Sequence, residues 1–279
     1  MARKIGIMQG RLSPPVGAAI QAFPLATWRE EFFAAKQVPL HHIEWIFDTE
    51  DSLNPIANDA GIAEIKSLSR QCEVKVNSLC ADFFMSELLL GKSPVQDKVC
   101  AEKLGWLLVQ GAKLGIKYIV LPFVDRSVIK TDADKKRLID LMQAFAPHLE
   151  RFGVEFHLET SLPPAPFAHV LESMGSPFVK INYDTGNSAS LGYDMNEEFA
   201  AYGEYIGSIH IKDRLRGAGT VPLGKGHVEF LKLPSALEKI DYQGDFVLQV
   251  ARGETGDEIS WARRNIAFLN NLFPQEVSS

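Results

Sequence analysis

Three short apolar segments, each ending at or near a residue that can bind a metal ion, limit most strongly what this chain can fold into. They cover residues 156–160, 179–184 and 206–210, and the residues that can bind a metal at or near their ends are Glu159, Asp184 and His210. Each has the length and composition of a buried strand, and they recur about every 25 residues with helical patterns between them. Parallel strands of a (β/α) barrel bring their carboxyl ends to one rim. We therefore expect these three side chains to meet.

The rest of the chain completes the pattern of a single eight-stranded barrel. Further strands are predicted at residues 4–9, 42–46, 74–79, 118–122 and 246–250, and helices at 27–36, 59–70, 97–114, 132–152, 166–174, 197–202, 230–240 and 258–272. The 279 residues match the typical length of such a barrel, about 250. The prediction is one α/β domain over residues 1–279, a parallel (β/α)8 TIM barrel with a Gly-rich loop at 212–227 and a polar tail at 275–279.

Composition excludes several classes of partner. The net charge of -6 offers no electrostatic footprint for nucleic acid. No apolar stretch approaches the roughly 20 residues that span a bilayer, so no membrane partner is expected. Nothing resembles a cleavable signal. The three cysteines are an odd number without metal-finger spacing, which indicates reduced thiols in a cytoplasmic protein.

A Glu, an Asp and a His at neighbouring strand ends form a mixed oxygen and nitrogen ligand set. Such a set suits one divalent ion of Mn, Mg, Co or Zn and differs from all-thiolate sites. The alternative is a buried, hydrogen-bonded polar cluster without a metal. That alternative is disfavoured because buried carboxylates are costly without a cation.

Four short motifs carry a resemblance to a known family. They are His157-Leu158-Glu159, Asp184-Thr185-Gly186-Asn187, His210-Ile211-Lys212-Asp213 and the turn at residues 224–230. With them the chain resembles the sugar isomerase/epimerase superfamily with the xylose-isomerase-like TIM barrel, of the ketose 3-epimerase or sugar phosphate isomerase type. The resemblance implies that Glu159, Asp184 and His210 bind a metal, that Glu159 is also a base, and that a residue of strand eight completes the set.

The chain departs from the family at two of these positions. Strand eight offers Gln249 where the family has Glu, and we assign Gln249 to the metal set and to the catalytic site as a neutral ligand. An amide cannot act as a base, so the second base is missing or comes from elsewhere. Glu254 in the following loop is an alternative ligand. Asn187 stands where many epimerases have a substrate-binding His, and an amide still hydrogen-bonds a hydroxyl or carbonyl.

Further residues are predicted to contact the substrate. Arg216 follows His210 by six residues, where family members often carry an Arg, and Lys212 adds positive charge that suits a phosphate or carboxylate. Glu44 and Asn77, at the predicted ends of strands two and three, could meet substrate hydroxyls. His157 shares the strand face of Glu159 one layer down and is expected in the core.

These residues predict a divalent-metal-dependent isomerase or epimerase that acts on a ketose or sugar phosphate through an enediolate. The loss of the second carboxylate favours chemistry with one base. The alternatives are a lyase of the inosose dehydratase kind and a sugar-binding barrel whose catalysis is weakened by Gln249. A repair nuclease is disfavoured by the net charge of -6 and by the seven scattered histidines. The resemblance also suggests a homo-oligomer.

Overall fold

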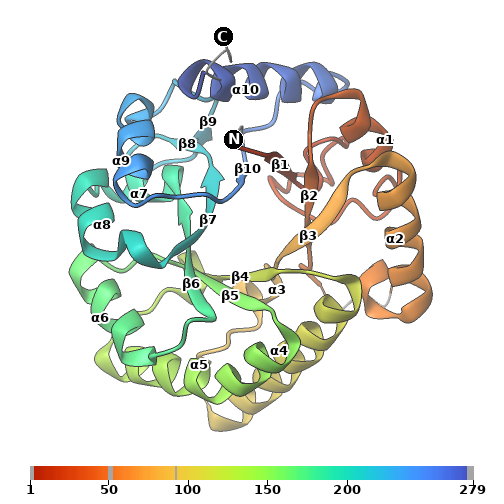
Figure 1. The fold of residues 1–279 in the computed structure, drawn as a ribbon. Helices are drawn as coiled ribbons and strands as arrows, with labels where there is room; N and C mark the ends of the chain where they lie inside the picture. Colours follow the sequence, from red (N-terminus) through yellow and green to blue (C-terminus); the bar gives the residue numbers. More distant parts are fainter. Residues whose placement is uncertain (1–2, 50–52, 92, 275–279) are drawn as a thin grey trace.

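The computed structural model, which describes residues 3–49, 53–91 and 93–274, contains a closed barrel of eight parallel strands inside a ring of helices (Figure 1). Around the barrel the strands follow the order β1-β10-β7-β6-β5-β4-β3-β2. The barrel strands are β1 Ile5–Met8, β2 His42–Ile46, β3 Lys75–Cys80, β4 Tyr118–Phe123, β5 Glu155–Thr160, β6 Val179–Asp184, β7 Ile206–Ile211 and β10 Phe246–Leu248. The predicted (β/α)8 fold is therefore confirmed.

Helices connect the strands and cover the outside of the barrel. They are α1 Glu30–Gln37, α2 Asp59–Cys72, α3 Phe83–Ser86, α4 Pro94–Leu114, α5 Asp132–Phe152, α6 Pro164–Met174, α7 Thr185–Leu191, α8 Met195–Tyr202, α9 Leu233–Lys239 and α10 Glu258–Leu272. Single 3-10 turns lie at Pro55–Ala57, Asp125–Ser127, Gly203–Tyr205 and Phe230–Lys232. The bounds of α5 follow from local chemistry, since Thr131 and Asp134 form a capping box and Gly153 ends the helix at a φ of 63°.

The burial of the strands explains why their apolar runs identified them in the sequence. All residues of β1 and β2 are buried, as expected for parallel strands that helices cover on the outside and side chains fill on the inside. Cys72, Cys80 and Cys100 are buried and none of the three is in a disulfide bond, as expected for reduced thiols. Among the described helices, none combines the length and the hydropathy needed to cross a bilayer.

Three elements differ from the prediction. The short helices α3 and α7 were not expected, because seven residues or fewer carry too few apolar positions to show a period. The loop expected at 212–227 contains an antiparallel hairpin of β8 Asp213–Arg214 and β9 Thr220–Val221. Its two-residue strands are too short for an alternating pattern. The predicted tail at 275–279 lies outside the described residues.

His42 in β2 is a buried imidazole without a hydrogen bond. It is 1% exposed, and neither ring nitrogen has a hydrogen-bond partner among the described residues. A Cβ atom at Gly6 would lie 2.1 Å from its Nε2, so the ring packs directly on that glycine. Oδ2 of Asp245 lies 3.9 Å from Nδ1, beyond hydrogen-bond distance. Burial lowers the pKa of His42 from 6.5 to about 4.

This burial predicts a loss of stability in mild acid. The unfolded chain binds a proton at His42 below pH 6.5, whereas the folded chain does so only near pH 4. The free energy of unfolding should therefore fall by about 2 kcal/mol between pH 7 and pH 5 from this residue alone. Urea unfolding of the wild type and of His42→Phe at both pH values measures the effect. Equal losses in the two proteins would contradict it.

Candidate metal centre

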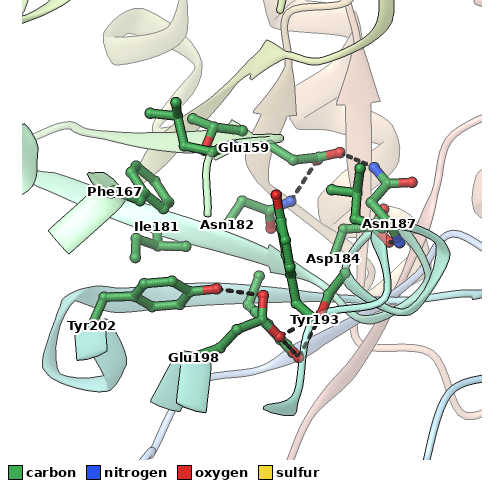
Figure 2. Close-up of a pocket in the computed structure, with 14 residues that line it drawn as sticks. Glu159, Phe167, Ile181, Asn182, Asp184, Asn187, Tyr193, Glu198 and Tyr202 are labelled. Carbon is green, nitrogen blue, oxygen red and sulfur yellow. Dashed lines mark hydrogen bonds between the residues drawn. The ribbon is translucent and has the colours of Figure 1, made fainter. Parts of the chain in front are cut away.

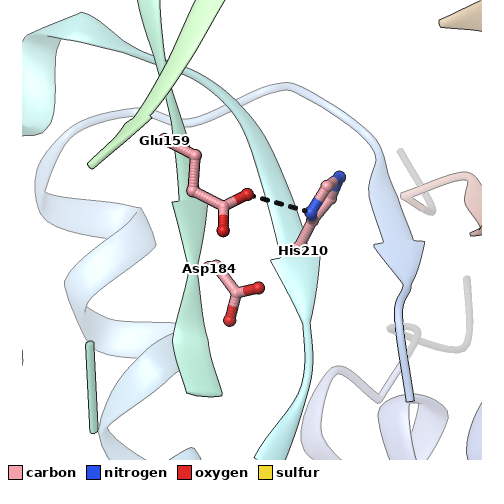
Figure 3. Close-up of side chains that lie close together, drawn as sticks. All are labelled: Glu159, Asp184 and His210. Atoms are coloured by element: carbon pink, nitrogen blue, oxygen red, sulfur yellow. Dashed lines mark ion pairs between the residues drawn. The ribbon is translucent and has the colours of Figure 1, made fainter. Parts of the chain in front are cut away.

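The three residues predicted to bind a metal come together at the ends of neighbouring strands (Figure 3). Glu159 lies in β5, Asp184 ends β6 and His210 lies in β7. Each offers one ligand atom, and these atoms all lie within 4.8 Å of one another. All three side chains are buried. The separations are small enough for modest side-chain movements to place the three atoms on one ion, so the predicted cluster is confirmed in its geometry.

Strand register and a helix cap hold Asp184. It pairs with His210 in the parallel β6–β7 register, so both side chains share the inner face. Its Oδ1 accepts a hydrogen bond from the backbone N–H of Asn187 at 2.8 Å, which makes Asp184 the N-cap of α7. Its Oδ2 accepts one from Nζ of Lys212 at 3.0 Å. Each oxygen retains a second lone pair for a cation.

A carboxylate holds the imidazole of His210 from one side. Nε2 lies 2.7 Å from Oε1 of Glu44, and both side chains are fully buried. Nδ1 lies on the other side, 3.6 Å from Oε2 of Glu159. Burial opposes a charge on the ring, but the carboxylates of Glu44 and Glu159 outweigh it and raise the pKa of His210 to about 10. When Nε2–H donates to Glu44, a cation at Nδ1 would take the place of the second proton.

Two amides orient the carboxylate of Glu159. Nδ2 of Asn187 donates to Oε1 at 2.5 Å, and Nδ2 of Asn182 donates to Oε2 at 2.9 Å (Figure 2). Burial alone would raise the pKa of Glu159, but hydrogen bonding and charge from His210 and Lys212, with the Asn182 amide, lower it below the usual value. Glu159 is therefore an ionised carboxylate with both oxygens fixed in direction.

The charge balance of the cluster fits a divalent cation. Three buried carboxylates, those of Glu44, Glu159 and Asp184, surround one imidazole, and Lys212 contributes the nearby ammonium group. Buried carboxylates are costly unless positive charge offsets them. Two carboxylate oxygens and one imidazole nitrogen form a donor set that suits Mn, Mg, Co or Zn.

Gln249 adds an unpaired oxygen to this end of the barrel. Val247 pairs with His210 in the β10–β7 register, so Gln249, two residues later, shares the inner face one level nearer the strand ends. Its Oε1 is buried and has no hydrogen-bond partner among the described residues. A buried carbonyl oxygen without a donor is costly, and a cation would satisfy it. The residues present therefore fit the metal that the sequence suggests.

Two residues predicted to contact substrate occupy other places. Glu44 lies behind the ring of His210 and is fully buried, so it supports a ligand instead of lining the opening. The expected position of Asn77 is wrong, because Asn77 is the third residue of β3 and not its end, which is Cys80. Asn77 instead lines a cavity of about 430 Å³ with Lys117, which precedes β4, and Gln243, which precedes β10. This is the amino end of the barrel, opposite the metal ligands.

The β8–β9 hairpin carries Arg216, another residue predicted to contact the substrate, and its Arg214 holds Asn187 of α7. Nη1 of Arg214 donates to Oδ1 of Asn187 at 2.7 Å, which turns the Asn187 amide nitrogen toward Glu159. Asp213 is buried and accepts hydrogen bonds from the backbone of the turn that follows, including Gly226 at 2.8 Å. A Cβ at Gly226 would lie 2.2 Å from that carboxylate, so the turn requires glycine. Arg216 is exposed on this anchored hairpin.

Asn182 is a site residue that the sequence reasoning missed. Its Nδ2 lies 2.9 Å from Glu159 and 3.0 Å from Nδ1 of His210, so it contacts two of the three ligands. Its own Oδ1 accepts a hydrogen bond from Ser208 at 2.8 Å. The signal was present, since Asn182 precedes Asp184 by two residues and shares its strand face. His157 lies in the core as predicted, hydrogen-bonded to Ser208.

Comparison with known proteins identifies the family of this chain. Residues 32–272 match the family described as xylose isomerase-like TIM barrel. The chain belongs to this family. A curated protein of Haemophilus influenzae, named as a candidate L-ribulose-5-phosphate 3-epimerase, SgbU, is 24% identical over 80% of this chain and 84% of its own length. An Escherichia coli K12 protein of the same name is 30% identical, over 28% of this chain and 30% of its own length.

Solved structures share this xylose isomerase-like fold. The IOLI protein with a bound zinc atom superimposes with a TM-score of 0.77. The match covers 98% of this chain and all of that one, at 16% sequence identity. At this identity the likeness establishes the fold alone. It agrees with the closed barrel and with the family match.

Proposed function

We propose that this member of the xylose isomerase-like family is a divalent-metal-dependent isomerase or epimerase that acts on a ketose or a sugar phosphate through an enediolate. The names of the two curated relatives support the class of reaction and substrate. The observation that carries the proposal is the setting of Glu159. It is an ionised, doubly oriented carboxylate whose oxygen lies within 4.8 Å of two other metal-binding atoms.

Each residue of the cluster has a defined task in this reaction. A divalent cation held here would act as a Lewis acid toward the substrate carbonyl and the adjacent hydroxyl. Glu159 takes the proton from the carbon beside that carbonyl, the C–H electron pair forms the enediolate double bond while the carbonyl π pair moves onto its oxygen, and the protonated Glu159 can return the proton. Asn182 and Asn187 keep its oxygens directed, while Asp184 and His210 hold the cation with it.

Gln249 decides between reactions with one base and with two. Epimerisation requires a proton to leave one face of the enediolate and another to arrive at the opposite face. An amide side chain neither accepts nor donates that proton as a carboxyl group does. The chain's own residues therefore favour return to the same face by Glu159, as in aldose–ketose interconversion. Gln249 then serves as a neutral ligand or a partner for a substrate oxygen.

The substrate contacts follow from the same end of the barrel. Asn187 and Lys212 border Glu159 and Asp184, and each can hydrogen-bond a sugar oxygen. Arg216, exposed on the β8–β9 hairpin, supplies a guanidinium group for a phosphate or carboxylate. The partner is accordingly a small sugar or sugar phosphate. A homo-oligomeric state and a cytoplasmic location stay predictions.

A substrate screen tests the proposal. The purified protein is freed of metal, reloaded with Mn²⁺ and incubated with ketopentoses, ketohexoses and their phosphates in deuterated water. Proton NMR then detects both product formation and deuterium incorporation beside the carbonyl. We expect incorporation with at least one substrate, and its absence throughout the panel would count against enediolate chemistry. A dehydrated product would indicate the lyase, and binding without exchange would indicate a sugar-binding barrel.

Restoring a carboxylate at position 249 should restore two-base chemistry. Gln249→Glu places a second acid–base group at the end of β10, and general acid–base groups contribute typically about 10²–10⁴-fold to such steps. The ratio of epimerised to isomerised product should rise at least about 10-fold, measured by NMR on the substrate found above. Gln249→Met, which keeps the size but has no carboxylate, is the control. An equal ratio in both variants would contradict the prediction.

A further inference from the structure

A chain of side-chain hydrogen bonds joins Gln249 to a carboxylate on another loop. Nε2 of Gln249 donates to Oε1 of Gln21 at 3.1 Å. Nε2 of Gln21 donates to Oδ2 of Asp82 at 2.6 Å. Gln21 lies between β1 and α1, Asp82 lies just after β3, and Gln249 follows β10. These hydrogen bonds therefore connect three separate segments at the carboxyl ends of the barrel strands. Gln249 is the last member of this series, and its Oε1 has no hydrogen-bond partner in the part of the chain that the structure describes.

The residues at the ends of this series of hydrogen bonds determine which group donates in each of them. A carboxylate accepts hydrogen bonds and a guanidinium donates them, whereas an amide has one accepting and one donating end. Asp82 therefore requires the NH₂ group of Gln21. Nη2 of Arg11 donates to Oε1 of Gln21 at 3.2 Å, which requires the oxygen on that side. With Gln21 fixed, Gln249 must present its own NH₂ group to it.

Arg11 is itself held in place. It is 5% exposed, its Nε donates to the carbonyl of Val250 at 2.9 Å, and its Nη1 donates to that of Ile20 at 2.8 Å. All three of its nitrogens are thus engaged with the β10 end and the β1–α1 loop. Asp82 can only accept and Arg11 can only donate, so neither can exchange its role. These two residues therefore determine which groups of Gln21 and Gln249 donate and which accept.

We infer that Gln21 is a positioning residue that turns the amide of Gln249 so that its oxygen, and not its nitrogen, is presented to the cation. This inference rests on the proposed metal-dependent function. In the reversed orientation Oε1 of Gln249 would meet Oε1 of Gln21 with no proton between them, and the NH₂ group would point toward a cation. Both arrangements are unfavourable. The neutral residue at this strand end thus acts as a ligand only because a neighbouring loop sets its direction.

Metal affinity, and not turnover, is the direct readout. Gln21→Met keeps the length of the side chain and removes its three side-chain hydrogen bonds, to Gln249, Arg11 and Asp82. The dissociation constant for Mn²⁺ is measured by calorimetry on the metal-free protein, with circular dichroism to verify folding. Loss of a group that orients a ligand typically weakens metal affinity about 10–100-fold, and we expect a loss in this range. Affinity equal to that of the wild type would overturn the inference.

A double-mutant cycle separates positioning from a general structural effect. In a Gln249→Met background there is no amide to orient, so adding Gln21→Met should leave the Mn²⁺ dissociation constant unchanged. The same fold-loss in both backgrounds would show that Gln21 acts by another route and would overturn the inference. A wild-type protein that binds no Mn²⁺ would instead refute the metal centre itself, and this inference with it.

A reversed pair tests the polarity of the chain directly. The double variant Gln21→Glu/Asp82→Asn conserves the net charge and reverses the direction of the hydrogen bond between positions 21 and 82. Asn at position 82 donates to Glu at position 21, which still accepts from Gln249 and Arg11. Its Mn²⁺ affinity should stay within about three-fold of the wild type, well short of the 10–100-fold loss. A loss as large as that of Gln249→Met would refute the polarity argument, even if Gln21→Met did not fold.

Discussion

Replacement of Glu159 by glutamine should abolish turnover while part of the Mn²⁺ binding survives. Glutamine keeps the size of the side chain and one oxygen ligand, but it cannot accept a proton. Loss of a general base typically costs about 10²–10⁴-fold, and kcat should fall by at least this factor. Mn²⁺ should bind more weakly, because one of the amide donors, Asn182 or Asn187, loses its acceptor.

A matched control lies on the same strand. Glu155→Gln makes the same chemical change at the start of β5, where the carboxylate contacts Nε2 of His157 at 2.9 Å instead of the metal ligands. Its kcat should stay within a few-fold of the wild type. The two variants are compared by NMR turnover assays and by Mn²⁺ calorimetry. Full activity in Glu159→Gln would refute its assignment as the base.

Exhaustive removal of divalent cations should stop turnover and lower the melting temperature. A cation present at 100 times its dissociation constant stabilises the folded state by about 2.7 kcal/mol. For a chain of this size that corresponds to roughly 5–10 °C. Both the activity and the melting temperature should return when Mn²⁺ is added. Unchanged turnover after complete chelation would count against a metal-dependent reaction.

The stabilisation by Mn²⁺ should depend on Asp184. Asp184→Asn removes a charged ligand while it keeps a cap for α7, and it should weaken Mn²⁺ affinity by at least about 10–100-fold, the loss seen when only an orienting group is removed. Asp140→Asn, on the exposed side of α5 where Asp140 pairs with Lys136, is the control and should show the wild-type shift in melting temperature. A full shift in Asp184→Asn would exclude it as a ligand.

The sequence located the three candidate metal ligands because their signal is local. Each of Glu159, Asp184 and His210 lies at the end of an apolar run, and the spacing of the runs identified parallel βα units. Strand alternation then places all three side chains on the inner face. The same rule would have found Asn182, two residues before Asp184, had polar residues other than typical metal ligands been considered. The structure confirms the cluster to within 4.8 Å.

The positions of residues along the strands and the contacts between distant strands were harder to predict from the sequence. Asn77 was assigned to the end of strand three, but it is the third residue of β3 and lines a cavity at the opposite end of the barrel. Glu44 is correctly placed on β2, yet its role follows from a contact with His210, 166 residues away. The β8–β9 hairpin was missed because its two-residue strands are too short to show an alternating pattern.

The sequence by itself determined the barrel, the order of its units and the three candidate ligands, because the hydrophobic period of a strand or helix is a local property that recurs in each of the eight units. Only the tertiary structure decided which groups support those ligands. The hydrogen bonds from Gln249 to Gln21 and from His210 to Glu44 join residues more than 150 positions apart. Such bonds exist only after the barrel closes, because strand register, and not local preference, sets the distance and direction between the partners.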